Sequence, residues 1–278
     1  VGASNANRER IAAQSIDTLL EIRHQDVFRV DHHIHLRCEC SCEGTSAYFE
    51  PWAGVDGIDL VSLMDHAPGQ RQFASIEKYI EYYKKKYGYT DEALKQVMDD
   101  HFKASEAFSD PNREAISALC TEHDIALASH DDATLAHVLE SESLGCSLAE
   151  FPTTVEAGEA CHERDLLVMM GAPNVIRGGS HSGNVAAKDF ASRGWLDVLS
   201  SDYYPTALLP AAVKLTDPEI GMSLGDAIAT ITENPAKAAY FHDRGHLAEG
   251  LRGDVVLFSL DQHGVRVSET YVQGHRVF

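Results

Sequence analysis

Short apolar runs recur along this chain, and a segment with helical character follows each of them. The runs that we predict to be strands are 28–38, 59–66, 125–132, 145–152, 166–173 and 196–203. The predicted helical partners lie near 75–108, 112–123, 133–143, 153–164, 184–194 and 206–240. Strands that alternate with helices form βα units around a parallel sheet, so the sequence predicts an α/β fold.

Polar residues follow each predicted strand directly. They are Arg37 and Glu39, Asp65 and His66, His130 and Asp131, Glu150, Asn174, and Asp202. Parallel αβ barrels place their active sites at the carboxyl ends of several strands. A doubly wound open sheet, the alternative, would concentrate polar ends at one switch point. We therefore predict a TIM-like (β/α)8 barrel of the kind used by metal-dependent hydrolases.

Six strands do not close an eight-stranded barrel. The amphipathic segment 6–24 reads as a helix before the first visible strand, so we expect two βα units upstream of this chain. The tail alternates and turns like a β-meander. We divide the chain into a barrel over 1–245 and part of a small β domain over 246–278.

Residues 75–108 form an insertion that is longer than an ordinary βα loop. The insertion holds five tyrosines and three consecutive lysines, 84–86. It is either a helical lid over the site or a peripheral helix pair. Runs of charge usually only solvate a surface, so we favour the second interpretation for the lysines.

The composition excludes several classes of partner. The net charge of −20 argues against binding to nucleic acid or anionic membranes, and no apolar run reaches the roughly 20 residues of a membrane helix. The first ten residues do not resemble a signal peptide. Cys38, Cys40 and Cys42 have neither disulfide nor usual zinc spacing, so we expect reduced thiols in the cytoplasm. A homo-oligomer is compatible with this composition.

The stretch "DHHIHLRCE" (31–39) carries its ionisable side chains at one parity. Asp31, His33, His35, Arg37 and Glu39 would project from one face of a strand, where they suit an active-site wall or a solvated edge. We expect His33 and His35, which come earlier on the strand, to be structural. Arg37 is either a fork for phosphate or an ion-pair partner of Glu39.

Imidazoles and carboxylates at four strand ends suggest a metal site. We predict Glu39, His66, His130 and Asp202 as its ligands, although either histidine alone would more often be an ordinary hydrogen-bonded residue. This mixture of nitrogen and oxygen donors suits zinc, with manganese or iron as alternatives. Asp202 is also our candidate for the catalytic base.

The loop "GAPNVIRGGSHSGNVAA" (171–187) is a candidate for anion binding. Its glycines let backbone N–H groups approach an anion, a helix beginning near Asn184 would add partial positive charge, and Arg177 lies beside His181. A flexible loop with a helix cap explains the glycines but not the arginine. The residues that we predict to bind substrate are Arg37, Arg71, Arg177, His181 and Tyr203.

Five blocks resemble a known family in the same order: "LVSLMDHAPGQRQF", "ALASHDDAT", "AEFPTT", "MGAPNVIRGGSHSGNVAA" and "LSSDYYP". They are similar to the phosphonate-metabolism diphosphatases of the carbon–phosphorus lyase pathway, within the amidohydrolase superfamily of metal-dependent barrels. The resemblance implies hydrolysis of α-D-ribose 1-methylphosphonate 5-triphosphate to the 5-phosphate with release of pyrophosphate. It also implies His66 and His130 as ligands, Glu39 as a bridging carboxylate and Asp202 as ligand and base.

This chain departs from the superfamily in two respects, its first ligand strand and the strand that carries Glu150. An H-x-H-like ligand pair belongs on the first barrel strand, and no such strand precedes residue 28. We keep two alternatives: an amidohydrolase that cuts a C–N bond, such as a deaminase or cyclic amidase, and a non-catalytic scaffold subunit. Glu150, on the strand where a ligand histidine is often found, has no assigned role.

Overall fold

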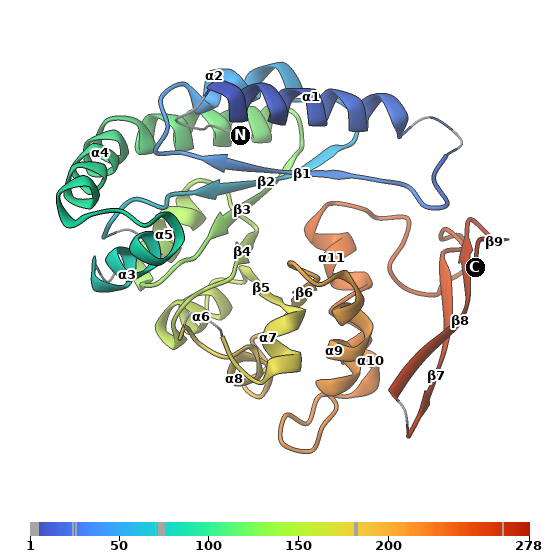
Figure 1. The fold of residues 1–278 in the computed structure, drawn as a ribbon. Coiled ribbons are helices and arrows are strands. Elements are labelled where there is room, and N and C mark those ends of the chain that lie inside the picture. The colour runs from blue at the N-terminus through green and yellow to red at the C-terminus, as the bar shows by residue number, and fades with distance from the viewer. Residues whose placement is uncertain are drawn as a thin grey trace.

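A computed structural model describes residues 6–23, 25, 27–69, 71, 76–180, 183–262 and 264–278. Six parallel strands form one sheet in chain order. They are β1 (Ile34–Glu39), β2 (Ile58–Met64), β3 (Ala126–His130), β4 (Leu148–Glu150), β5 (Leu167–Gly171) and β6 (Val198–Ser200). Figure 1 shows the strands following one another around an arc, an open half-barrel, with helices along its outer side.

The helices fall mainly between consecutive strands. The α-helices are α1 (Ala6–Ile22), α2 (Thr45–Phe49), α3 (Ile76–Tyr87), α4 (Asp91–Glu122), α5 (Leu135–Ser143), α6 (Val155–His162), α7 (Ala172–Arg177), α8 (Ala187–Ala191), α9 (Leu208–Lys214), α10 (Leu224–Ala229) and α11 (Glu233–Ala238). Two short 3₁₀ helices are η1 (Glu50–Trp52) and η3 (Pro205–Ala207). The predicted alternation of strands and helices is therefore confirmed.

The two faces of the sheet have different apolar cores. The inner face of the arc holds one small cluster that includes Ala128, Leu148, Met169, Val198 and, from α11, Ala238. Two larger clusters occupy the outer face, where the strands meet the helices. β3 is buried at every residue because apolar groups or helices cover both of its faces.

Short loops keep the strand ends close together. Thr134 caps α5 by accepting a hydrogen bond from the His137 amide, and Thr154 caps α6 in the same way from Ala157. Each threonine stands four residues after the last residue of the preceding strand. The repeated arrangement leaves the residues between strand and cap at the carboxyl end of the sheet.

The insertion differs from its predicted form. We predicted helical segments at 75–108 and 112–123, whereas α3 ends at Tyr87 and a single helix, α4, runs through Pro111. Asn112, just after the proline, is buried and donates to the carbonyls of Cys40 (2.9 Å) and Cys42 (2.8 Å). These tertiary contacts offset the backbone hydrogen bond that proline removes.

The predicted helical region 206–240 is divided. It contains the short helices α9, α10 and α11, and Gly221, with φ of 80°, lies between the first two. A left-handed backbone angle ends a helix and favours glycine. The division places Ala238 against the inner face of the sheet.

The tail forms a separate antiparallel sheet of β7 (Val255–Asp261), β8 (Gly264–Val272) and β9 (His275–Arg276), as the meander pattern predicted. Arg252, just before β7, forms an ion pair with Asp31 at 2.5 Å. The pair links the tail to the segment that precedes β1. Among the described helices, none combines the length and the apolar character needed to cross a bilayer.

Candidate active site

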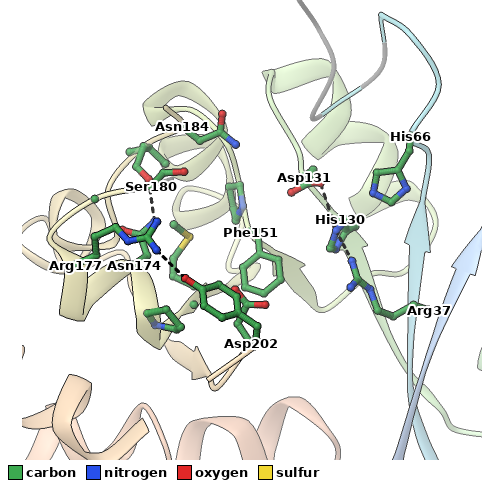
Figure 2. A pocket seen from close by; sticks show the side chains of 17 residues that line it. Arg37, His66, His130, Asp131, Phe151, Asn174, Arg177, Ser180, Asn184 and Asp202 are labelled. Atoms are coloured by element: carbon green, nitrogen blue, oxygen red, sulfur yellow. Dashed lines mark hydrogen bonds and ion pairs between the residues drawn. The ribbon is translucent and has the colours of Figure 1, made fainter. Parts of the chain in front are cut away.

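A cleft lies at the carboxyl ends of the strands. Its walls come from the ends of β1 through β6 and from the loop after α7. The lining residues are Arg37, His66, His130, Asp131, Phe151, Pro152, Met170, Gly171, Pro173, Asn174, Arg177, Gly179, Ser180, Asn184, Val185, Asp202 and Tyr203. Figure 2 shows His66, His130, Asp131 and Arg37 on one side of Phe151, and Arg177 on the other.

Three side chains on one wall could hold a metal ion. His66, His130 and Asp131 each offer a ligand atom, and these atoms lie within 4.8 Å of one another. His130 ends β3, His66 follows the end of β2 by two residues, and Asp131 follows His130. We call these three residues the metal group.

A carboxylate orients each histidine of the metal group. His66 Nδ1 lies 2.5 Å from Glu39 Oε2, and His130 Nδ1 lies 2.8 Å from Glu150 Oε2. His130 and Glu150 are neighbours in register on β3 and β4, so they share one face of the sheet. Histidines that bind metals usually donate their second ring nitrogen to a carboxylate in this way. In both histidines, Nε2 is therefore the ring atom that could bind a metal ion.

Arg37 meets the metal group from β1. Its Nη2 lies 2.7 Å from His130 Nε2, and the guanidinium can only donate. His130 therefore accepts at Nε2 and donates from Nδ1 to Glu150, which is the tautomer that a metal ligand needs. Phosphate binding by Arg37 stays a prediction. Arg37 does line the cleft.

Burial and pairing shift the titration of these groups. Burial alone would raise the pKa of Glu150, but its hydrogen bond and attraction to His130 outweigh burial and lower the pKa to about 2. Burial is likewise outweighed at Glu39, whose pKa is lowered by His66, and at His66, whose pKa is raised by Glu39. Burial raises the pKa of Asp131, with His130 and His66 opposing.

The face of β1 predicted from parity is present. Leu36 and Cys38 are buried in the outer core, while His35, Arg37 and Glu39 face the inner side. His35 Nε2 lies 2.5 Å from the hydroxyl of Ser62, which donates to Glu150 (2.7 Å). Burial lowers the pKa of His35. These contacts agree with a structural role for His35 as a support of the Glu150 and His130 pair.

His33 lies before β1. It contacts Asp59 at 2.7 Å and the ring of Phe241, whose centroid is 4.5 Å from its own. It does not line the cleft. These contacts also agree with the predicted structural role.

Two predicted ligands have other positions. Glu39 accepts from the His66 amide (3.1 Å) and from Ser41 (2.9 Å) besides the His66 ring, so it lies behind the metal group. Asp202 lies on the opposite side of the cleft, beside Gly171. Added to Gly171, a Cβ atom would come within 3.4 Å of the Asp202 carboxylate. That is an ordinary van der Waals distance, so Gly171 and Asp202 are close neighbours on this side of the cleft.

Asp131 was not among the candidate ligands that the sequence suggested. On a regular strand it would point away from the face that carries His130. In the structure Asp131 has φ of 57°, so the chain turns and the carboxylate lies 3.3 Å from His130 Nε2. The repeated aspartates after His130, in "SHDDAT", were the available signal.

Arg177 ends α7 and reaches across the other wall of the cleft. Its Nη2 donates to the hydroxyl of Tyr203 at 3.2 Å, so two of the predicted substrate-binding residues meet. The Asn174 side chain accepts from the Ala187 amide at 3.0 Å, which joins the two ends of the intervening loop. His181 lies outside the described residues.

The helix after this loop differs from the prediction. We placed its start near Asn184, but α8 begins at Ala187 and spans five residues. Its N-cap residue, Ala186, makes no side-chain hydrogen bond to the first turn. Anion binding by this helix N-terminus stays a prediction, and Arg177 is the cation that the described residues place on this wall.

Arg71 is buried rather than exposed to the cleft. Its side chain is 3% exposed, and its two terminal nitrogens contact the carboxylates of Asp132 and Glu140. Carboxylates on both terminal nitrogens leave little of the guanidinium for an anionic ligand. Contact of Arg71 with substrate stays a prediction that these interactions do not favour.

The donors present fit a divalent metal ion. Two imidazoles and one carboxylate are a set that Zn²⁺ accepts, and catalytic zinc sites commonly use three protein ligands. Two carboxylates already orient the imidazoles. Asp202 lines the same cleft.

Comparisons with known proteins agree with this chemistry. A family model described as "Amidohydrolase family" matches residues 165–278. The alpha-D-ribose 1-methylphosphonate 5-triphosphate diphosphatase of Escherichia coli (strain K12) is 48% identical over 264 residues, which are 95% of this chain and 70% of that protein. The chain belongs to the amidohydrolase family. The three residues of the metal group precede the segment that the family model matches, and all three line the cleft.

Solved amidohydrolase structures share the fold. The dihydropyrimidinase from Brevibacillus agri NCHU1002 has a TM-score of 0.58 and 11% identity, over 95% of this chain and 73% of that one. The D-hydantoinase from Bacillus sp. AR9 has a TM-score of 0.57 and 12% identity, over 95% and 74%. At this identity the likeness supports the barrel architecture alone.

Proposed function

We propose that this amidohydrolase hydrolyses α-D-ribose 1-methylphosphonate 5-triphosphate to the 5-phosphate and pyrophosphate, in phosphonate catabolism. The 48% identity to a diphosphatase named for this substrate, over 95% of the chain, carries the proposal. The cleft supports it, because a wall of nitrogen and oxygen donors faces a wall with an arginine.

His66, His130 and Asp131 would hold a divalent cation, for which zinc is our first choice and manganese or iron the alternatives. Such a cation, when bound, polarises a phosphoryl oxygen and lowers the pKa of water. Glu39 and Glu150 orient the two imidazoles through their Nδ1 atoms, so that Nε2 is the atom each ring would offer to the cation. We infer that Glu39 acts behind the ligands rather than as the bridging carboxylate.

The remaining residues act on the substrate and the proton. Asp202 accepts the proton of the attacking water as the new P–O bond forms, and the bridging P–O bond breaks to release pyrophosphate. Arg177 binds phosphate oxygens with its guanidinium, assisted by Tyr203. Arg37, beside His130, is placed to bind a phosphate oxygen at the metal side.

The six cysteines support a cytoplasmic location, which we also propose. All six are free, and burial raises the pKa of Cys38 to about 12 and also raises the pKa of Cys146 above its ordinary value. Thiols held protonated in a core do not need an oxidising compartment.

The test is an assay of the metal-loaded full-length protein. Incubation with the ribosyl triphosphate should yield pyrophosphate and the ribosyl 5-phosphate in equal amounts, and chelation of the metal should abolish both. Dihydropyrimidine and hydantoin rings serve as the C–N bond controls. Turnover of a ring substrate without release of pyrophosphate would replace the proposal with a cyclic amidase.

A further inference from the structure

Two buried aspartates adjoin the metal group without facing the cleft. Asp65 precedes His66 and is 2% exposed, and Asp132 follows Asp131 and is 1% exposed. Neither residue lines the cleft. Buried carboxylates are costly unless they are paired, so the partners of these two residues indicate what they do.

Asp65 is held by the long helix of the insertion. Its Oδ2 accepts hydrogen bonds from Ser105 (2.8 Å) and Ser109 (2.6 Å), and lies 3.4 Å from Arg113 Nη2. The three donors are spaced by four residues and so form one stripe along α4. Asp65 Oδ1 accepts from the Ala67 amide at 3.0 Å. The backbone on both sides of His66 is therefore tied to α4.

Asp132 is held from the other side. Arg71 and Ser129 donate to its carboxylate, and Ser141 of α5 lies 3.4 Å from both of its oxygens. The Asp132 carbonyl accepts from the Thr153 amide at 2.8 Å. The backbone that follows Asp131 is thus fixed to its neighbours as well.

Glu140 of α5 joins the two aspartates into one network. Its Oε1 lies 3.1 Å from Arg113 Nη1, and its Oε2 lies 2.6 Å from Arg71 Nη2. The result is a continuous series of alternating charge, Asp65–Arg113–Glu140–Arg71–Asp132. We call these five residues the charge chain. It begins beside one member of the metal group and ends beside another.

The charge chain is better suited to fixing the positions of nearby residues than to stabilising the fold. Buried ion pairs contribute little net stability because desolvation offsets their attraction, whereas their directional contacts specify one arrangement. A metal site needs its ligands fixed within fractions of an ångström. Here two guanidiniums, each shared between carboxylates, span the gap between two strand ends.

We propose that the charge chain positions His66 relative to His130 and Asp131, and that its members are positioning residues for the metal group. The inference rests on the metal group of the proposed function. It also gives the insertion a role, since α4 supplies Arg113 and both serines. Arg71 then belongs to this network rather than to the substrate wall.

The test changes the middle of the charge chain, away from the cleft. Glu140→Gln keeps the shape of the side chain but removes the charge shared by Arg113 and Arg71. Zinc affinity of the full-length protein is measured by competition with a chelator. We expect Glu140→Gln to weaken zinc binding about 10–100-fold, the scale for residues that orient ligands.

Two variants of the same helix serve as controls. Glu142→Gln makes the same change at a residue that pairs with Arg164, outside the charge chain. Val138→Ala removes buried core volume and should lower thermal stability, and it changes no residue of the charge chain. Both should keep parental zinc affinity, which separates loss of positioning from loss of stability.

A second variant covers poor folding of Glu140→Gln. Arg71→Lys keeps the charge but cannot contact Asp132 and Glu140 at once, so it too should weaken zinc binding. Parental zinc affinity in the folded variants, or a parent that binds no zinc, would overturn the inference. A parent that binds zinc but leaves the ribosyl triphosphate intact would refute the proposed function alone.

Discussion

The two walls of the cleft are built differently. On the metal side, His130 is 4% exposed and Asp131 is 5% exposed, and each histidine has a carboxylate on Nδ1. On the other side, Asp202 is exposed and Tyr203 is 59% exposed. One wall is fixed by buried partners, and the other meets solvent.

This difference is consistent with metal binding on the first wall and substrate binding on the second. Ligands of a metal ion must be held in place before the ion arrives, and buried partners do this. Groups that bind a flexible triphosphate need reach and charge, which exposed arginine and tyrosine side chains provide. Changes on the first wall should therefore act on metal binding, and changes on the second should act on substrate.

The largest effect should come from the histidines of the metal wall. His130→Ala and His66→Ala should each lose bound metal and turnover, by more than the roughly 10–100-fold typical of residues that only orient ligands. Metal analysis and activity of the purified variants measure this. His33→Ala, at a histidine outside the cleft, is the control. A fully metallated, active His130→Ala variant would show that the wall is not a metal site.

Asp202→Asn should separate the two walls next. An amide cannot accept the proton of water, so we expect turnover to fall by about 10²–10⁴-fold while the metal content stays at the parental level. Metal content and kcat are measured on the same sample. Loss of metal would move Asp202 to the metal wall, as a ligand. A change in KM alone would make it a binding residue.

Arg177 should show a smaller effect that is confined to substrate. Arg177→Ala should weaken binding of the triphosphate by about 1.5–3 kcal/mol, the scale of hydrogen bonds to charged groups. Arg177→Lys should restore part of this because it lacks the planar fork. Arg193→Ala, whose guanidinium lies over Trp195, is a matched control. Parental KM values in both Arg177 variants would leave the exposed wall without a role in phosphate binding.

The last effect concerns the stability of the metal-free protein rather than its activity. The pKa of Glu150 is lowered to about 2, so its stabilisation is present above its ordinary pKa and is lost as the pH falls toward 2. Glu150→Gln should cost roughly 2–3 kcal/mol at neutral pH. Denaturant unfolding at several pH values tests this. The parent and variant should converge in acid, and a difference that persists there would place the effect in packing.

The sequence predicted the fold and the placement of the cleft because both follow from strand ends. Parallel strands bring their carboxyl ends to one edge, so Glu39, His66 and His130 had to meet there. Periodicity also predicted the polar face of β1. Periodicity could not predict that Asp131 lies beside His130 Nε2, because this contact depends on the left-handed backbone at Asp131.

Burial explains the other differences. A sequence shows that Arg71 is charged but not that Asp132 and Glu140 surround it. Pro111 signals a helix end, yet contacts of Asn112 with the segment after β1 carry α4 through it. In both cases the outcome depends on tertiary contacts, which a local sequence pattern does not reveal.

The most direct test is the location of the metal ion itself. Crystals of the full-length protein grown with zinc should give an anomalous scattering peak between His66, His130 and Asp131, with Asp202 across the cleft. The same crystals of the His130→Ala variant should lose the peak. The absence of a peak at these three residues would contradict the assignment of the two walls. A zinc peak only on the opposite wall, beside Asp202, would contradict it as well.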